Sequence, residues 1–146
     1  MIVTQAELFK NVGQDALEMV RSYGSERAYE SQAVVFREGE RAENFYILVD
    51  GKVHVVIGEE EEICFAIDRT GQVFGWSALV EPYQYRAGAH CLIPANLVEI
   101  PREAIERVLH DYPTDGAIIF RNLAALVTER MYEAYRKTAS EADPWR

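Results

Sequence analysis

The chain has 146 residues, a length that suits one domain with a single hydrophobic core. Its net charge of −9 and the scattered placement of its 15 basic residues argue against nucleic-acid binding, because phosphate contacts need clustered Lys and Arg. No apolar run is long enough to cross a membrane, and residues 1–5 lack the pattern of a signal peptide, so we expect a cytoplasmic protein that does not associate with membranes.

Two short helices are predicted at the N-terminus. Thr4 and Glu7 have the spacing of a capping box, so the first helix should begin there and end near Gly13. Apolar residues at helical spacing between positions 16 and 20 predict a second helix, which ends by Gly24.

Short strands at regular spacing follow, and this pattern predicts an all-β barrel or roll. Asp50 and Gly51 lie between two of these strands and predict a tight hairpin, because both residues tolerate a positive φ. The acidic run at residues 59–62 is expected to be a loop exposed to solvent. The predicted strands of this region cover residues 27–29, 33–36, 45–49, 53–57 and 63–67.

Two late strands and a helix complete the predicted roll. The strands cover residues 87–92 and 97–100, with a bend at residues 94–96, Pro-Ala-Asn, between them. A helix is predicted over residues 102–112, and Pro113 ends it.

A long helix is predicted from about residue 114 to 137, and its apolar residues form two stripes. The first stripe has the 3-4 spacing of a coiled-coil seam and predicts a homodimer through this helix. One stripe could close the roll while the other meets a partner chain, or both could pack within one chain. Residues 138–146 are expected to be a loose tail, so the domain covers residues 1–137. The seam consists of Ala117, Phe120, Ala124, Val127, Met131 and Ala134, and the second stripe consists of Ile119, Leu123 and Leu126.

The most informative part of the chain is residues 37–89, and within it the segment at residues 71–80, GQVFGWSALV. It predicts a strand, a glycine turn and one short helical turn, an arrangement that points backbone N–H groups at an anion. Together with residues 85–89, YRAGA, it resembles the cyclic-nucleotide-binding domain family. The resemblance implies a mainly β fold, a double-stranded β-helix or jelly-roll-like β-roll with N-terminal helices and a long C-terminal helix. It covers nearly the whole chain but not the helix-turn-helix that DNA-binding members carry after the long helix.

The resemblance also implies a ligand site around the glycine turn. Trp76 stands where the family has a glutamate that accepts a hydrogen bond from the ribose hydroxyl, and an indole can only donate. The phosphate-binding arginine is Arg86 if positions are counted forward from Trp76. Counted back from the strand at 97–100, the register that we prefer, Tyr85 takes its place and Arg86 points the other way. The predicted site residues are Phe74, Gly75, Trp76, Ser77, Ala78, Tyr85, Arg86 and Ala87.

These departures predict weakened or lost affinity for cyclic AMP and no certain cofactor. The leading interpretation is a non-catalytic regulatory sensor for a small anionic or aromatic ligand, with Trp76, Tyr83 and Tyr85 as an aromatic pocket. If these aromatics instead fill the cavity, the chain is an interaction or structural dimer module. A small β-barrel enzyme is a third possibility, but such an enzyme would need clustered His and Glu ligands.

No metal site is predicted. His54 and His90 lie in predicted strands and His110 ends a helix, and nothing along the chain pairs these groups at metal-ligand spacing. Cys64 and Cys91 also lie within predicted strands, where we expect them to be small buried residues in a reducing compartment.

Overall fold

The computed structural model describes residues 2–58 and 62–142. The elements in chain order are α1 (Ile2–Gln5), η1 (Glu7–Phe9), α2 (Gln14–Tyr23), β1 (Ser25–Tyr29), β2 (Val34–Phe36), β3 (Asn44–Ile57), β4 (Glu62–Ile67), β5 (Val73–Phe74), η2 (Trp76–Leu79), β6 (Gly88–Pro101), α3 (Arg102–Asp111) and α4 (Pro113–Ala142).

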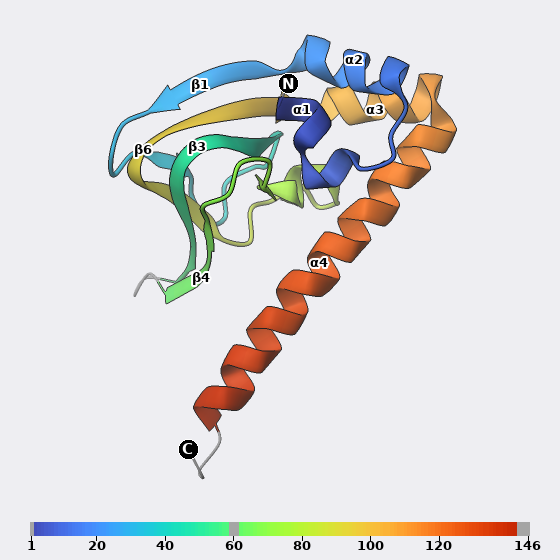
Figure 1. The fold of residues 1–146 in the computed structure, drawn as a ribbon. Helices are drawn as coiled ribbons and strands as arrows, with labels where there is room; N and C mark the ends of the chain where they lie inside the picture. The colour runs from blue at the N-terminus through green and yellow to red at the C-terminus, as the bar shows by residue number, and fades with distance from the viewer. Residues whose placement is uncertain (1, 59–61, 143–146) are drawn as a thin grey trace.

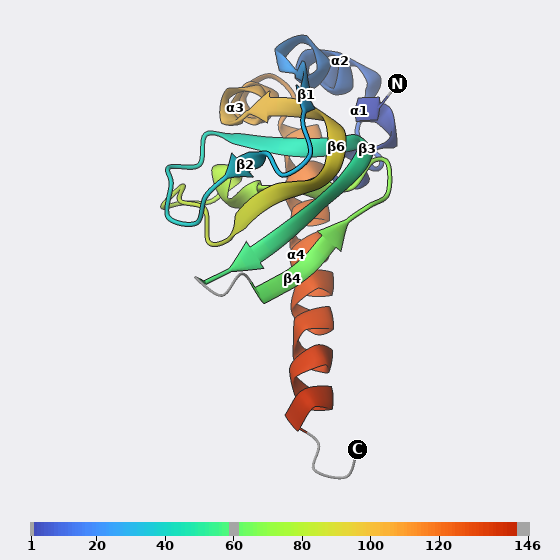
Figure 2. The ribbon, with the colours of Figure 1, turned by 90° about the vertical axis from the view of Figure 1, so that its left-hand side faces the viewer.

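The strands form one antiparallel sheet that curls into a roll. Its order is β1-β6-β3-β4, with β2 paired to β6 and β5 paired to β3. The N-terminal helices and α3 cover one end of the roll, and α4 runs past the sheet and projects beyond it (Figure 1 and Figure 2). The predicted jelly-roll-like fold with flanking helices and a long C-terminal helix is therefore confirmed.

Two strands of 14 residues each, β3 and β6, form the spine of the roll, and the predicted hairpin at Asp50 and Gly51 is wrong. Both residues lie inside β3, where the pairing with β6 shifts register. Gly51 has φ 100°, and a Cβ there would lie 2.5 Å from the carbonyl oxygen of Pro94 and 2.6 Å from Cα of Ala95. A glycine is required because the two strands bend and approach each other at this bulge. The bend predicted at residues 94–96 likewise lies inside one strand.

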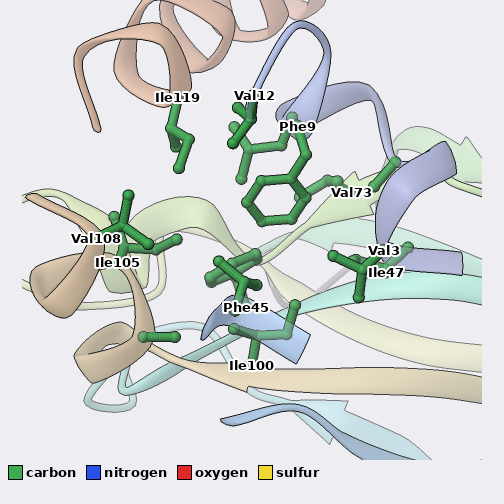
Figure 3. Close-up of a cluster of buried hydrophobic side chains, with 14 of the residues drawn as sticks. Val3, Phe9, Val12, Phe45, Ile47, Val73, Ile100, Ile105, Val108 and Ile119 are labelled. Carbon is green, nitrogen blue, oxygen red and sulfur yellow. The ribbon is translucent and has the colours of Figure 1, made fainter. Parts of the chain in front are cut away.

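Alternation along β3 divides the hydrophobic core into two clusters. Phe45 and Ile47 point toward the helices, while Tyr46 and Leu48 point into the roll. The helix-side cluster fixes the first half of α4 against the sheet. Figure 3 shows this cluster, with Val3, Phe9, Val12, Phe45, Ile47, Val73, Ile100, Ile105, Val108 and Ile119 labelled.

The N-terminal segment differs from the predicted capping box. Thr4 lies inside α1, and the Glu7 carboxylate accepts a hydrogen bond from the Val73 N–H at 2.9 Å instead of capping a helix. Glu7 thus ties the N-terminal segment to β5, a partner 66 positions away that the local pattern does not reveal. The second helix ends at Tyr23, with Gly24 as its C-cap, as predicted.

Polar contacts hold the first half of α4 against the N-terminal segment. The Asn122 side-chain amide donates to the carbonyls of Leu8 and Lys10 at 2.9 and 2.8 Å. The Asp115 carboxylate accepts from the Gly13 N–H at 2.9 Å. These contacts fix the direction in which α4 leaves the roll.

The end of α4 also differs from the prediction, since the helix continues to Ala142 and not to residue 137. Residues 138–142 contain neither Gly nor Pro, and the first helix breaker after residue 137 is Pro144. The predicted tail at 143–146 and most of the predicted acidic loop, at 59–61, lie outside the described residues. Within the described residues, none of the helices is both long and apolar enough to span a membrane.

Candidate ligand-binding site

The predicted strand, glycine turn and helical turn are present as β5, Gly75 and η2. Gly75 has φ 78°, and a Cβ there would lie 3.1 Å from the Phe36 ring and 3.3 Å from the Tyr46 ring. A side chain at this position would be strained and crowded, so glycine lets the chain turn close to the aromatic interior. The Ala78 N–H donates to the Gly75 carbonyl at 3.3 Å, so the turn itself uses one amide of the predicted anion site.

Arg102, the first residue of α3, anchors this turn. Its Nε donates to the Ala78 carbonyl and its Nη2 donates to the Ala42 carbonyl, both at 2.7 Å. The guanidinium also lies 3.7 Å from the centre of the Tyr83 ring. Sequence reasoning missed this residue, because an arginine at a helix start has no local mark that distinguishes an anchor from a solvent-exposed charge.

A cavity of about 120 Å³ lies beside the turn, and four of its nine lining residues are aromatic. Two predicted site residues, Phe74 and Ala78, are fully buried in the roll and do not line it. The predicted residues that line it are Gly75, Trp76, Ser77, Tyr85, Arg86 and Ala87, and the structure adds Phe36, Val55 and Phe65 from three other strands.

Tyr85 points into the roll. Its ring stacks on Phe36 with centres 3.8 Å apart and an angle of 7° between the planes. Its hydroxyl donates to the Asn44 carbonyl, and burial raises the pKa of Tyr85 to about 12. Arg86, by contrast, is exposed at the rim. Among the described residues, it is the one charged side chain that lines the cavity.

The floor of the cavity continues into the core as a stack of aromatic rings. Phe36 contacts Tyr46 at 5.9 Å between ring centres, and Tyr46 contacts Phe74 at 5.5 Å. Tyr46 is buried deeply enough to raise the pKa of its hydroxyl well above the usual range. Of these rings, Phe36 lines the cavity, whereas Tyr46 and Phe74 are packed in the core behind it.

Helix α4 touches the outer wall of the cavity through Arg130. Trp76 and Phe65 form that wall, with nearly parallel rings 6.3 Å apart. The Arg130 guanidinium lies 4.5 Å from the centre of the Phe65 ring and 6.0 Å from that of Trp76. Its Nε is buried without a hydrogen-bond partner in the described residues, while its Nη1 forms an ion pair of 3.7 Å with Glu133. Sequence reasoning missed Arg130, since no local pattern relates α4 to the wall.

The histidines and cysteines were only partly predicted. His54 and His90, expected to be unpaired, lie directly opposite each other in the pairing of β3 with β6. Counting positions along one strand missed this pair because the contact runs across strands. Cys91 is a free, buried residue as predicted, whereas the side chain of Cys64 lies outside the described part of the structure.

Comparisons with known proteins agree with the fold. The family described as "Cyclic nucleotide-binding domain" matches residues 26–112. The chain is similar to Glutaminase 1 of Bradyrhizobium diazoefficiens, with 27% identity over 92% of this chain and 22% of that protein. It is also similar to the Global nitrogen regulator of a Nostoc species, with 30% identity over 91% of this chain and 62% of the regulator. The chain thus spans less than two thirds of either relative.

The fold is also similar to solved structures. A cyclic nucleotide-binding domain from Methylobacillus flagellatus superposes with a TM-score of 0.82 and 19% sequence identity. The match covers 97% of this chain and 81% of the other, so it includes the flanking helices as well as the roll.

Proposed function

This chain belongs to the cyclic nucleotide-binding domain family, and on that basis we propose that it is a non-catalytic sensor module with weakened or lost affinity for cyclic AMP. Its ligand is a small molecule with an aromatic ring or a negative charge. The observation that carries the proposal is the orientation of two neighbours, with Tyr85 stacked inside on Phe36 and Arg86 exposed at the rim.

The chemistry that family members use for a cyclic nucleotide is replaced at two positions. Tyr85 takes the interior place that the preferred register assigns to the phosphate-binding arginine. Trp76 takes the place of the glutamate that accepts from the ribose, and an indole N–H cannot accept. A hydrogen bond to a charged group contributes about 1.5–3 kcal/mol, so the loss of both contacts should weaken cyclic AMP binding by more than about tenfold.

The size of the cavity also favours a ligand smaller than a nucleotide. Its volume is about 120 Å³, below the roughly 300 Å³ at which pockets for drug-sized ligands begin. The rings of Trp76 and Phe65 offer a stacking surface, and the Arg86 guanidinium at the rim can pair with a carboxylate. A small aromatic acid satisfies both features.

A thermal-shift screen tests the proposal, because a ligand that binds only the folded state raises the melting temperature. We expect at least one of benzoate, salicylate and indole-3-carboxylate to raise it at millimolar concentration, while cyclic AMP and cyclic GMP leave it unchanged. Trp76→Ala should abolish the shift, and Tyr132→Ala, which removes an exposed aromatic on α4, should preserve it. A shift with either cyclic nucleotide at micromolar concentration would contradict the proposal.

A second candidate is an interaction or structural dimer module with a collapsed pocket. The continuous stack of Phe36, Tyr46 and Phe74 favours it, because core packing alone accounts for those rings. This candidate predicts that no compound of the screen changes the melting temperature and that the chain is a dimer with or without them.

Under either candidate, we propose that two copies of the chain associate through α4. Ile119 and Leu123, of the second apolar stripe, are buried against the roll. Beside them, five of the six seam residues are exposed, with Val127 at 39% and Met131 at 47%, while Phe120 is half-buried against the core. A second copy suits this face because an identical seam with alternating small and large residues lets two helices pack closely.

We also propose that the chain is not an enzyme. Its similarity to Glutaminase 1 extends over 22% of that protein, so it does not carry a glutaminase activity over to this chain. The regulator relative and the family match both favour a regulatory role.

A further inference from the structure

A pair of histidines lies on the outer face of the sheet, away from the ligand cavity. His54 of β3 and His90 of β6 are directly opposite partners. Their strand neighbours Val53 and Cys91 are fully buried inside the roll, so alternation turns both histidines outward. The ring centres lie 5.9 Å apart with an angle of 73° between the planes.

This spacing matches two imidazoles that share one metal ion. A ligating imidazole nitrogen lies about 2.0–2.1 Å from a zinc ion, so the centres of two rings that share one ion lie roughly 4.5–6.4 Å apart, depending on the angle between the two ligands. We propose that His54 and His90 form a surface site for a divalent transition-metal ion, with Cu²⁺ bound most tightly. Imidazole nitrogens suit Cu²⁺, Ni²⁺ and Zn²⁺, and among these ions the affinity series peaks at Cu²⁺.

Burial lowers the pKa of His54, and the neighbouring His90 and Lys52 lower it further. This shift favours the neutral imidazole, which is the form that binds metals.

The surroundings leave the remaining coordination positions to water. Within residues 2–58 and 62–142, no group of three or more His, Cys, Asp or Glu side chains could hold a metal together. His90 lines a hollow of about 220 Å³, and Glu38 and Arg37 also line it. One Glu38 oxygen already accepts from the Gly58 N–H at 3.0 Å. The proposed site therefore has two histidine ligands from the protein, and its other coordination positions are open to water.

Titration of the untagged chain with Cu²⁺ tests the site, with calorimetry for affinity and electron paramagnetic resonance for nitrogen ligation. We expect one ion per chain and a spectrum with two nitrogen ligands. Removal of a residue that only hydrogen-bonds to a metal ligand lowers metal affinity by about 10- to 100-fold. Because His54 and His90 are the proposed ligands themselves, His54→Gln and His90→Gln should each lower the affinity for Cu²⁺ by at least about tenfold. His110→Gln is the matched control, since His110 lies on α3 with its side chain 82% exposed and should leave the affinity unchanged.

A second measurement needs no variant. Sub-stoichiometric Cu²⁺ should broaden the imidazole proton signals of His54 and His90 in the nuclear magnetic resonance spectrum and leave those of His110 sharp. The inference is overturned if all three histidines broaden equally or none does. It is also overturned if the folded double variant His54→Gln with His90→Gln binds Cu²⁺ as tightly as the unmodified chain.

Discussion

Tyr85 and Arg86 are adjacent in the sequence, yet they give the cavity opposite chemical properties. The tyrosine is 5% exposed and stacked on Phe36, while the arginine is at the rim. If the register moved by one residue, a guanidinium would enter the interior. The polarity of the site therefore depends on which of two successive side chains faces inward.

Restoring the two family side chains should restore binding of cyclic AMP. We expect Trp76→Glu combined with Tyr85→Arg to tighten the dissociation constant by at least about tenfold, because a charge-assisted contact contributes about 1.5–3 kcal/mol. Calorimetry gives the affinity directly. Trp76→Glu combined with Tyr85→Met is the control, since it supplies the carboxylate without the guanidinium and should not tighten binding. Equal affinities for the two variants would show that position 85 does not contact the phosphate.

Arg102 is expected to stabilise the fold more than any exposed arginine of the same helix. Arg102→Met removes both hydrogen bonds to the carbonyls of Ala78 and Ala42 and the contact with Tyr83. We predict a loss of about 2–4 kcal/mol in the free energy of unfolding, measured by urea denaturation. Arg107→Met is the matched control, because Arg107 makes an exposed ion pair with Asp111 and should cost below about 0.5 kcal/mol. Similar losses for the two variants would refute the anchoring role.

At the scale of elements, β3 and β6 bend together where Gly51 meets Pro94 and Ala95. A bulge increases the local twist of a strand, which helps a flat pair of strands to curl into a roll. Pro94 is tolerated inside β6 because a bulge frees its position from the regular hydrogen-bond ladder.

Gly51→Ala should therefore destabilise the roll by about 2–4 kcal/mol, from backbone strain at positive φ together with a clash against β6. Gly39→Ala provides the matched control, since Gly39 has φ 91° but nothing within 4 Å of an added Cβ. It should cost only the strain, about 1 kcal/mol. Thermal or urea unfolding of both variants measures the difference, and equal costs would show that the close approach at Gly51 is unimportant.

The sequence predicted most elements but not how some of them join. The Asp50-Gly51 pair favours positive φ in a hairpin and in a bulge alike, so only the partner strand distinguishes them. Gly75 was predictable because its role in the turn is local. Phe65, Arg130 and the histidine pair were not, because their contacts join strands and helices that are distant in the chain.

At the scale of the whole molecule, α4 connects the cavity to the proposed dimer seam. Arg130 packs over the cavity wall, and its neighbours Val127 and Met131 are exposed on the seam. A ligand that displaces Trp76 would therefore change the surroundings of the helix that we propose binds a second copy.

We predict that Val127→Glu combined with Met131→Glu converts the dimer into a monomer, because four carboxylates would face one another in the seam. Both side chains are exposed in the single chain, so its fold should persist. Substitution of Phe120 would be a less specific test, because Phe120 packs on the core. Sedimentation at micromolar concentration measures the state. Ala125→Glu with Tyr132→Glu, at exposed α4 positions outside the seam, should remain dimeric. A monomeric unmodified chain would contradict the assembly.

The most direct test of the central claim is calorimetric titration of the unmodified protein with cyclic AMP. With Tyr85 inside the roll and Trp76 in place of the ribose acceptor, we predict a dissociation constant no tighter than about 1 mM, roughly −4 kcal/mol. A micromolar dissociation constant would contradict the account, because it would mean that Arg86 reaches the phosphate and that the cavity opens to admit a nucleotide.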